Sequence, residues 1–194
     1  MSVRRLGTAV GAACLLAAAG AQASTVIGLS IEDQARLSKY VVIGEVASQE
    51  GVDDSENGLE TAVTLKVAAV LKGDVHPGDS LVFHTRSGEL DGESSTAIGE
   101  VVLHPGQRIL VFVEEIDGRL YNIGLSYGVF NVSTDALGHV AFRRAIEDGL
   151  DVVSDSGTGD GPFTLDDVRT RVAYAGRHLR YDNPLVRDAY VGGR

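Results

Sequence analysis

Apolar and polar residues alternate with a period of two through the middle of the chain. The clearest stretch is "LETAVTLKVAAVLKG" (59–73), in which Val63, Leu65 and Val67 share one face and Glu60 falls on the other. A period of two is typical of a β-strand with one buried face. The alternation weakens over the last apolar residues of this stretch, where we expect a β-bulge.

Other segments predict further strands. The segment "YVVIGEVAS" (40–48) begins apolar on both faces, which indicates a central strand. The segments "HPGDSLVFHT" (76–85) and "HPGQRILVFVEE" (104–115) each place a His-Pro-Gly turn before an apolar strand. We interpret this echo as shared turn chemistry rather than as a repeat. Asp117-Gly118 is a two-residue hairpin signal.

Two polar stretches predict long loops between these strands. The first is acidic and runs from Gly51 to Gly58, and the second, rich in glycine and serine, includes Ser87–Ser95. Long loops on a scaffold of short-turned strands are common places for binding residues.

A helix is expected on each side of the strands. Ser30 stands three residues before Asp33 at the start of "SIEDQARLS", which is the spacing of a capping box and predicts a short helix from Ser30 to Ser38. Thr164 and Asp167 have the same spacing in "TLDDVRTRVAYAG". Gly176 is suited to the C-cap of that second helix, whose apolar positions are Leu165, Val168 and Val172.

The order of elements predicts an all-β-dominated fold with flanking helices, built as a sandwich or a small barrel of short strands. We divide the chain into a β domain at 24–145, a flexible acidic linker at 146–163, and a C-terminal helix and tail at 164–194.

The first residues have the pattern of a cleaved signal peptide, 1–23. Arg4 and Arg5 precede an apolar run, and Ala21-Gln22-Ala23 offers small residues for cleavage, which would make Ser24 the first mature residue. No second apolar run approaches the roughly 20 residues that span a bilayer. We therefore expect an exported protein, periplasmic or extracellular, without a membrane span in its mature form.

Two alternatives to simple export stay open, namely twin-arginine export and lipid attachment at Cys14. If cleavage follows Ala23, the mature chain loses its only cysteine and has no disulfide. Without Arg4 and Arg5 it carries 15 basic and 27 acidic residues, a net charge of −12. Such a charge disfavours nucleic acid and anionic lipid as partners.

The acidic stretch also has the spacing of half a calcium loop. Asp53, Ser55, Asn57 and Gly58 fit its first positions, but the twelfth position is Thr64, which supplies no carboxylate. We interpret the stretch as an exposed turn centred on Asn57-Gly58. Weak calcium binding by its acids remains an alternative.

No motif indicates catalysis or a bound cofactor. The chain has no Gly-x-Ser-x-Gly elbow, and its histidines lack the spacing of a zinc site. Glu114 and Glu115 point to opposite faces of a strand and do not form a catalytic pair. We expect a protein that is not an enzyme and that holds no metal or cofactor. The histidines are His76, His84, His104, His139 and His178.

Taken together, the segments from Ser38 to Val132 resemble the netrin-like module of the tissue inhibitors of metalloproteinases. The resemblance implies an OB-like barrel of five to six strands, with a long loop between the first two. In that family an N-terminal cysteine binds the protease zinc, whereas here the predicted mature start is Ser24-Thr25, so no inhibitory residue transfers. The matching segments are "SKYVVIGEVAS", "QEGVDDSENGLET", "VTLKVAAVLKGD", "GDSLVFHTR", "PGQRILVFVEE" and "GRLYNIGLSYG".

The leading hypothesis is an exported, non-enzymatic module that binds another protein, with a protease as one candidate partner. Its contact residues are expected in the acidic loop, at Asp53, Asp54, Glu56 and Asn57. The alternatives are an envelope structural or assembly component, and a hydrolase or metal-dependent enzyme whose residues converge only in three dimensions.

Overall fold

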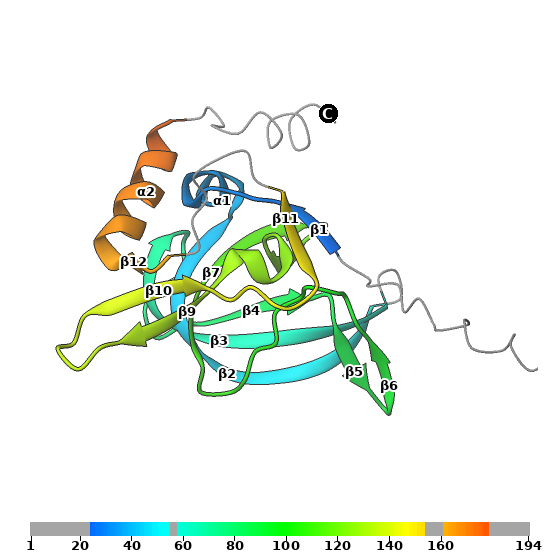
Figure 1. Cartoon of the computed structure of the whole chain (residues 1–194). Helices are drawn as coiled ribbons and strands as arrows, with labels where there is room; N and C mark the ends of the chain where they lie inside the picture. The colour runs from blue at the N-terminus through cyan, green and yellow to red at the C-terminus, as the bar shows by residue number, and fades with distance from the viewer. Residues whose placement is uncertain (1–23, 55–57, 154–160, 179–194) are drawn as a thin grey trace, which may run out of the picture.

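The computed structural model describes residues 24–54, 58–153 and 161–178 (Figure 1). The predicted signal peptide lies outside the described residues, and the first strand begins at Ser24. The elements are β1 (Ser24–Ile27), α1 (Ile31–Leu37), β2 (Tyr40–Asp54), β3 (Gly58–Lys72), β4 (Ser80–Thr85), β5 (Gly88–Leu90), β6 (Glu93–Ser95), β7 (Arg108–Ile116), β8 (Arg119–Asn122), the 3-10 helix η1 (Leu125–Gly128), β9 (Val129–Thr134), β10 (Val140–Arg144), β11 (Leu150–Val153), β12 (Phe163–Thr164) and α2 (Leu165–Arg177).

The predicted β-dominated fold with flanking helices is confirmed. The main sheet has the strand order β12-β10-β9-β7-β2-β3-β4-β8. Strand β8 also pairs with β7, and it meets β4 at one parallel pair, His84 with Tyr121. The pairings therefore return on themselves through β7, β2, β3, β4 and β8, while β9, β10 and β12 continue the sheet beyond β7.

Strands β2 and β7 separate two apolar cores, which explains why both begin apolar on each face. Val41 and Ile43 of β2 belong to one core, and Val42 and Val46 belong to the other. The first core also holds Phe130 and residues of both helices. The second lies among the strands of the ring and is filled by β3, β4 and β7. Successive residues on a strand point to opposite faces, so a strand between two cores must be continuously apolar.

The expected bulge lies where β3 meets the start of β2. The register passes from Val42↔Val70 to Gly44↔Val67, so that β3 contains one residue more than its partner over this stretch. Gly44 is required at this point because a Cβ would come within 2.5 Å of the Lys66 carbonyl oxygen.

Both helices begin as predicted. Ser30 caps α1 by accepting a hydrogen bond from the Asp33 backbone N–H at 3.0 Å. Thr164 and Asp167 form a complete capping box at α2. The predicted C-cap of α2 was wrong: Gly176 lies inside the helix, which ends at Arg177 and has His178 as its C-cap.

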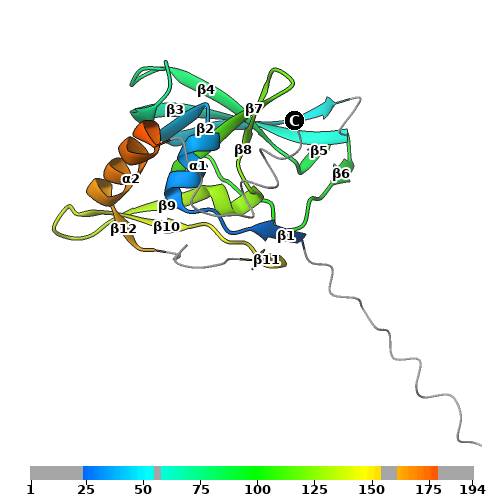
Figure 2. The ribbon, with the colours of Figure 1, turned by 90° about the horizontal axis from the view of Figure 1, so that it is seen from above.

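The C-terminal helix packs on the body of the protein, beside α1 (Figures 1 and 2). Its buried face consists of Val168, Val172 and Ala175, which all join the first core. The tail beyond His178 lies outside the described residues.

Three predicted loops or linkers contain strands. The acidic stretch is a hairpin in which Asp54 pairs with Gly58, so only residues 55–57 separate β2 from β3 and the expected long loop is absent. The second polar stretch contains the hairpin β5–β6. The predicted linker contains β11, which pairs in parallel with β1. In each case the segment forms a strand although its side chains are polar, because the hydrogen bonds between paired strands involve main-chain groups alone.

Candidate functional site

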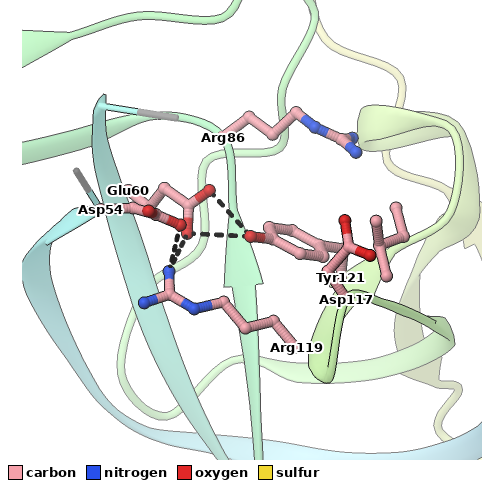
Figure 3. Close-up of a pocket in the computed structure, with 7 residues that line it drawn as sticks. Asp54, Glu60, Arg86, Asp117, Arg119 and Tyr121 are labelled. Carbon is pink, nitrogen blue, oxygen red and sulfur yellow. Dashed lines mark hydrogen bonds and ion pairs between the residues drawn. The ribbon is translucent and has the colours of Figure 1, made fainter. Parts of the chain in front are cut away.

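A hollow of about 330 Å³ lies where the ends of two hairpins meet the end of β4 (Figure 3). The β2–β3 hairpin supplies its acidic wall, and the β7–β8 hairpin supplies the opposite side. We call it the hairpin-tip site. Its lining residues are Asp54, Glu60, Arg86, Ile116, Asp117, Arg119 and Tyr121.

The floor of the site is a buried carboxylate. The Glu60 side chain accepts hydrogen bonds from the Tyr121 hydroxyl, at 3.0 Å to Oε1 and 3.3 Å to Oε2. Both residues are almost fully buried, with exposed fractions of 1% for Glu60 and 4% for Tyr121. Glu60 lies on the polar face of β3 and is nevertheless buried, because Tyr121 of β8 and Gly88 of β5 come against this end of the strand.

Arg119 joins the two acids of the β2–β3 hairpin. Its Nη1 lies 2.6 Å from Asp54 Oδ2 and 3.2 Å from Glu60 Oε2 (Figure 3). Arg119 follows directly after the Asp117-Gly118 turn, in which both residues have positive φ as a tight hairpin turn requires. The predicted turn is thus confirmed, and it aims Arg119 across the hollow.

Protonation in this network is fixed by its neighbours. Burial, and then the hydrogen bond to Glu60, raise the pKa of the Tyr121 hydroxyl. The Tyr121 side chain, and then Asp54 and Glu60, raise the pKa of Arg119. Tyr121 therefore remains a hydrogen-bond donor and Arg119 remains a cation at neutral pH.

Arg86 differs from Arg119 in having no acidic partner in the site. Its guanidinium lies 5.1 Å from the centre of the Tyr121 ring, within the range of a cation–π contact. In the view of Figure 3, Arg86 lies above Tyr121 and Arg119 below it. Within the described part of the chain the Arg86 guanidinium makes no hydrogen bond or ion pair. Burial raises the pKa of nearby Glu114, and the charge of Arg86 partly opposes this rise.

A second buried carboxylate holds the surrounding loops. Glu100 accepts backbone hydrogen bonds from Arg86 at 3.0 Å and from Val101 at 2.9 Å. It also accepts a side-chain hydrogen bond from Asn122 at 2.8 Å. Glu100 thereby fixes the chain after β4 against the end of β8, which sets the position from which Arg86 leaves the backbone.

Close approach of β5 also shapes the site. A Cβ on Gly88 would overlap the backbone of Glu60, with 2.7 Å to its nitrogen. Only glycine fits at this crossing, so Gly88 allows β5 to lie against the strand that carries the buried acid.

The structure divides the predicted contact residues. Asp54 lines the hairpin-tip site, whereas Asp53 is exposed on β2 and is not part of its lining. Neighbouring strand residues point to opposite faces, which accounts for the difference. Glu56 and Asn57 lie outside the described residues. Four residues of the site were not predicted, because no local spacing in the sequence marks residues that strand pairing brings together: Glu60, Arg86, Arg119 and Tyr121.

An enzyme site that converges only in three dimensions would need side chains such as His84, His104 and His139 to gather, and these lie in different parts of the fold. His84 is half-buried on β4, with Nδ1 3.3 Å from the Leu120 carbonyl oxygen. His104 is exposed before β7, and His139 pairs with Asp135 in the β9–β10 hairpin. Among the residues that the structure describes, no three His, Asp, Glu or Cys side chains gather closely enough to hold a metal ion.

No family model matches this chain, and the searches of curated proteins and of solved structures return no significant match. In the described ranges, neither helix has the length and apolar character needed to cross a bilayer.

Proposed function

We propose that this chain is an exported, non-enzymatic module that binds another protein through the hairpin-tip site. The observation that carries the proposal is the ion network of Asp54, Arg119, Glu60 and Tyr121, placed at the open ends of two hairpins. Its acids are already bound by Arg119 and Tyr121. They form a rigid floor, and the exposed groups above it, Arg86 and Asp117, are available for contact.

The stability of the fold alone does not explain why a buried ion network lies at this place. Burying a carboxylate costs desolvation energy, and apolar residues of the same volume often stabilise a protein equally well. A fixed network does, however, hold the groups around it in one geometry, which reduces the entropy lost when a partner binds. The position of the network beside a hollow supports a role in recognition.

We also propose that the strand ring is an OB-like barrel of the netrin-like type. In chain order its strands are β2, β3, β4, β7 and β8, and the parallel contact joins the third and the fifth. OB-folds bind ligands with the loops between strands one and two and between strands four and five. The corresponding connections here are β2–β3 and β7–β8, which are the two hairpins of the site. A protease is one partner consistent with this resemblance.

Export rests on the pattern of residues 1–23 described above. The residues that follow the proposed cleavage point belong to the fold, because β1 pairs with β11. A cysteine-free domain with two apolar cores does not depend on a disulfide for its stability in an oxidising compartment.

The proposal is tested by quantitative capture from the exported fraction of the cells that make the chain. Asp117→Arg changes an exposed residue of the site that lies outside the ion network, and Asp166→Arg makes the same change on α2, away from the site. We expect a protein retained by the wild type and by Asp166→Arg to be lost with Asp117→Arg. Equal retention by all three chains, or no retained protein, contradicts the proposal.

A further inference from the structure

The two arginines of the hairpin-tip site have different surroundings. Arg119 already holds Asp54 and Glu60. Arg86 is exposed, it lies against the face of the Tyr121 ring, and its guanidinium N–H groups are not used by any described residue. An arginine packed on an aromatic ring keeps its planar edge available for an incoming anion.

We propose that Arg86 binds a carboxylate of the partner protein, which enters the hollow beside the Tyr121 ring. The inference rests on the proposed function and names the chemistry that the same site recognises. A guanidinium pairs with a carboxylate through two parallel N–H···O bonds, which adds geometric selectivity to the charge attraction.

The acids of the site select a singly charged anion. Asp54, Glu60 and Asp117 line the same hollow, and Arg119 is shared between the first two. A doubly charged phosphate would meet stronger repulsion from these acids than a carboxylate would, while gaining the attraction of the same single cation, Arg86.

The wall of the hollow suits the group that carries the carboxylate. Ile116, which is half-buried, provides apolar surface next to the polar groups, beside the largely buried ring of Tyr121. A partner residue with a short apolar stem and a terminal carboxylate fits this combination. The carboxylate has two possible sources, the C-terminus of a chain or an Asp or Glu side chain, and the experiment distinguishes them.

The test is a titration followed by NMR, observing the side-chain Nε–H resonances of the arginines. N-acetyl-leucine represents a C-terminal carboxylate, and N-acetyl-glutamate α-amide represents an acidic side chain. N-acetyl-leucine amide is the neutral control, and inorganic phosphate tests the charge argument. Arg86→Gln is compared with Arg108→Gln, which alters an exposed arginine at the start of β7 that does not line the site.

We expect at least one carboxylate probe to shift the Arg86 resonance and to bind about tenfold more weakly to Arg86→Gln, the loss of one charge-assisted pair. Arg108→Gln should bind as the wild type does, and the amide should not bind. The inference is overturned if Arg86→Gln keeps full affinity, if phosphate binds more tightly than both carboxylates, or if no probe binds. The probe that binds more tightly identifies the source.

Failure of this inference is distinguishable from failure of the proposed function. If capture still depends on Asp117 but is unchanged in Arg86→Gln, the module binds its partner without a carboxylate at Arg86. Because Arg86 is exposed and its structural bond to Glu100 uses the backbone N–H, the variant should fold normally, which its amide spectrum verifies.

Discussion

Replacing Tyr121 with Phe isolates the hydrogen bond at the floor of the hairpin-tip site. The substitution removes the hydroxyl that donates to Glu60 at 3.0 Å but keeps the ring that packs against Arg86. Both Tyr121 and Glu60 are buried, so water cannot easily replace the lost donor. Glu60 then keeps the contact with Arg119 at 3.2 Å.

The expected loss follows from the charge on the acceptor. A hydrogen bond to a charged group contributes about 1.5–3 kcal/mol, and leaving a buried carboxylate short of a donor adds to the cost of its burial. For a chain of this size each kcal/mol corresponds to about 2–4 °C in the melting temperature. Tyr121→Phe should therefore melt roughly 3–12 °C below the wild type.

The assay is urea unfolding of the chain from Ser24 onward, with thermal melting as a second measure. Tyr174→Phe is the control, because Tyr174 is exposed on α2 and should change stability by less than about 0.5 kcal/mol. A double-mutant cycle with Glu60→Gln should show a coupling of about 1 kcal/mol or more. If Tyr121→Phe is as stable as the wild type, or if the losses in unfolding free energy of the two variants simply add, the hydrogen bond between Tyr121 and Glu60 does not stabilise the site.

Three further changes test other parts of the structure. Gly88→Ala should destabilise the fold by about 1–3 kcal/mol in urea unfolding, because its Cβ would collide with the backbone of β3. Glu114→Gln should raise the melting temperature at pH 7. Burial raises the pKa of Glu114, so the ionised carboxylate destabilises the fold, whereas glutamine carries no charge. Thr164→Ala should cost about 1 kcal/mol by removing the capping box of α2.

Each of these three predictions has a control variant or a condition that tests it. Gly176→Ala, inside α2 with open space around it, should stabilise the fold by about 0.5–1 kcal/mol, opposite in sign to Gly88→Ala. The advantage of Glu114→Gln should be absent where the carboxyl is protonated in both states, develop as the pH rises from the unfolded pKa towards the raised folded pKa, and stay constant above it. An advantage that persists at pH 3 refutes the assigned cause. Thr170→Ala, exposed within α2, should not lower the stability, because Ala favours a helix interior more than Thr does.

Local chemistry made most of the fold predictable. The caps at Ser30 and Thr164 and the turn at Asp117-Gly118 each depend on residues within four positions of one another. The central strand was visible because a strand between two cores is apolar on both faces. The bulge in β3 was visible as a local break in a period of two.

Elements that depend on distant partners were not predictable. Strand β11 forms because β1, more than a hundred residues earlier in the chain, pairs with its backbone. The second half of β2, which extends to Asp54, is mostly exposed, so its sequence shows no alternation of apolar and polar residues. Polar side chains in these segments suggested loops, since the sequence does not reveal which backbone groups will find a partner.

The site was missed for the same reason. The residues after Glu60 alternate as in a strand with one buried face, which places Glu60 on the polar face. Glu60 is buried because Gly88 of β5 packs against its backbone and Tyr121 of β8 donates a hydrogen bond to its side chain. Of the predicted contact residues, Asp54 lines the hollow. Its partner Arg119, however, comes from a hairpin 65 residues away in the sequence.

Photo-crosslinking tests most directly whether the hairpin-tip site contacts a partner. A photoreactive residue at Asp117, in the site, is compared with the same residue at Asp166 on α2 in the exported fraction. The account predicts that one protein is joined to the chain from position 117 and not from position 166. Equal crosslinking from both positions, or crosslinking from 166 alone, would contradict it.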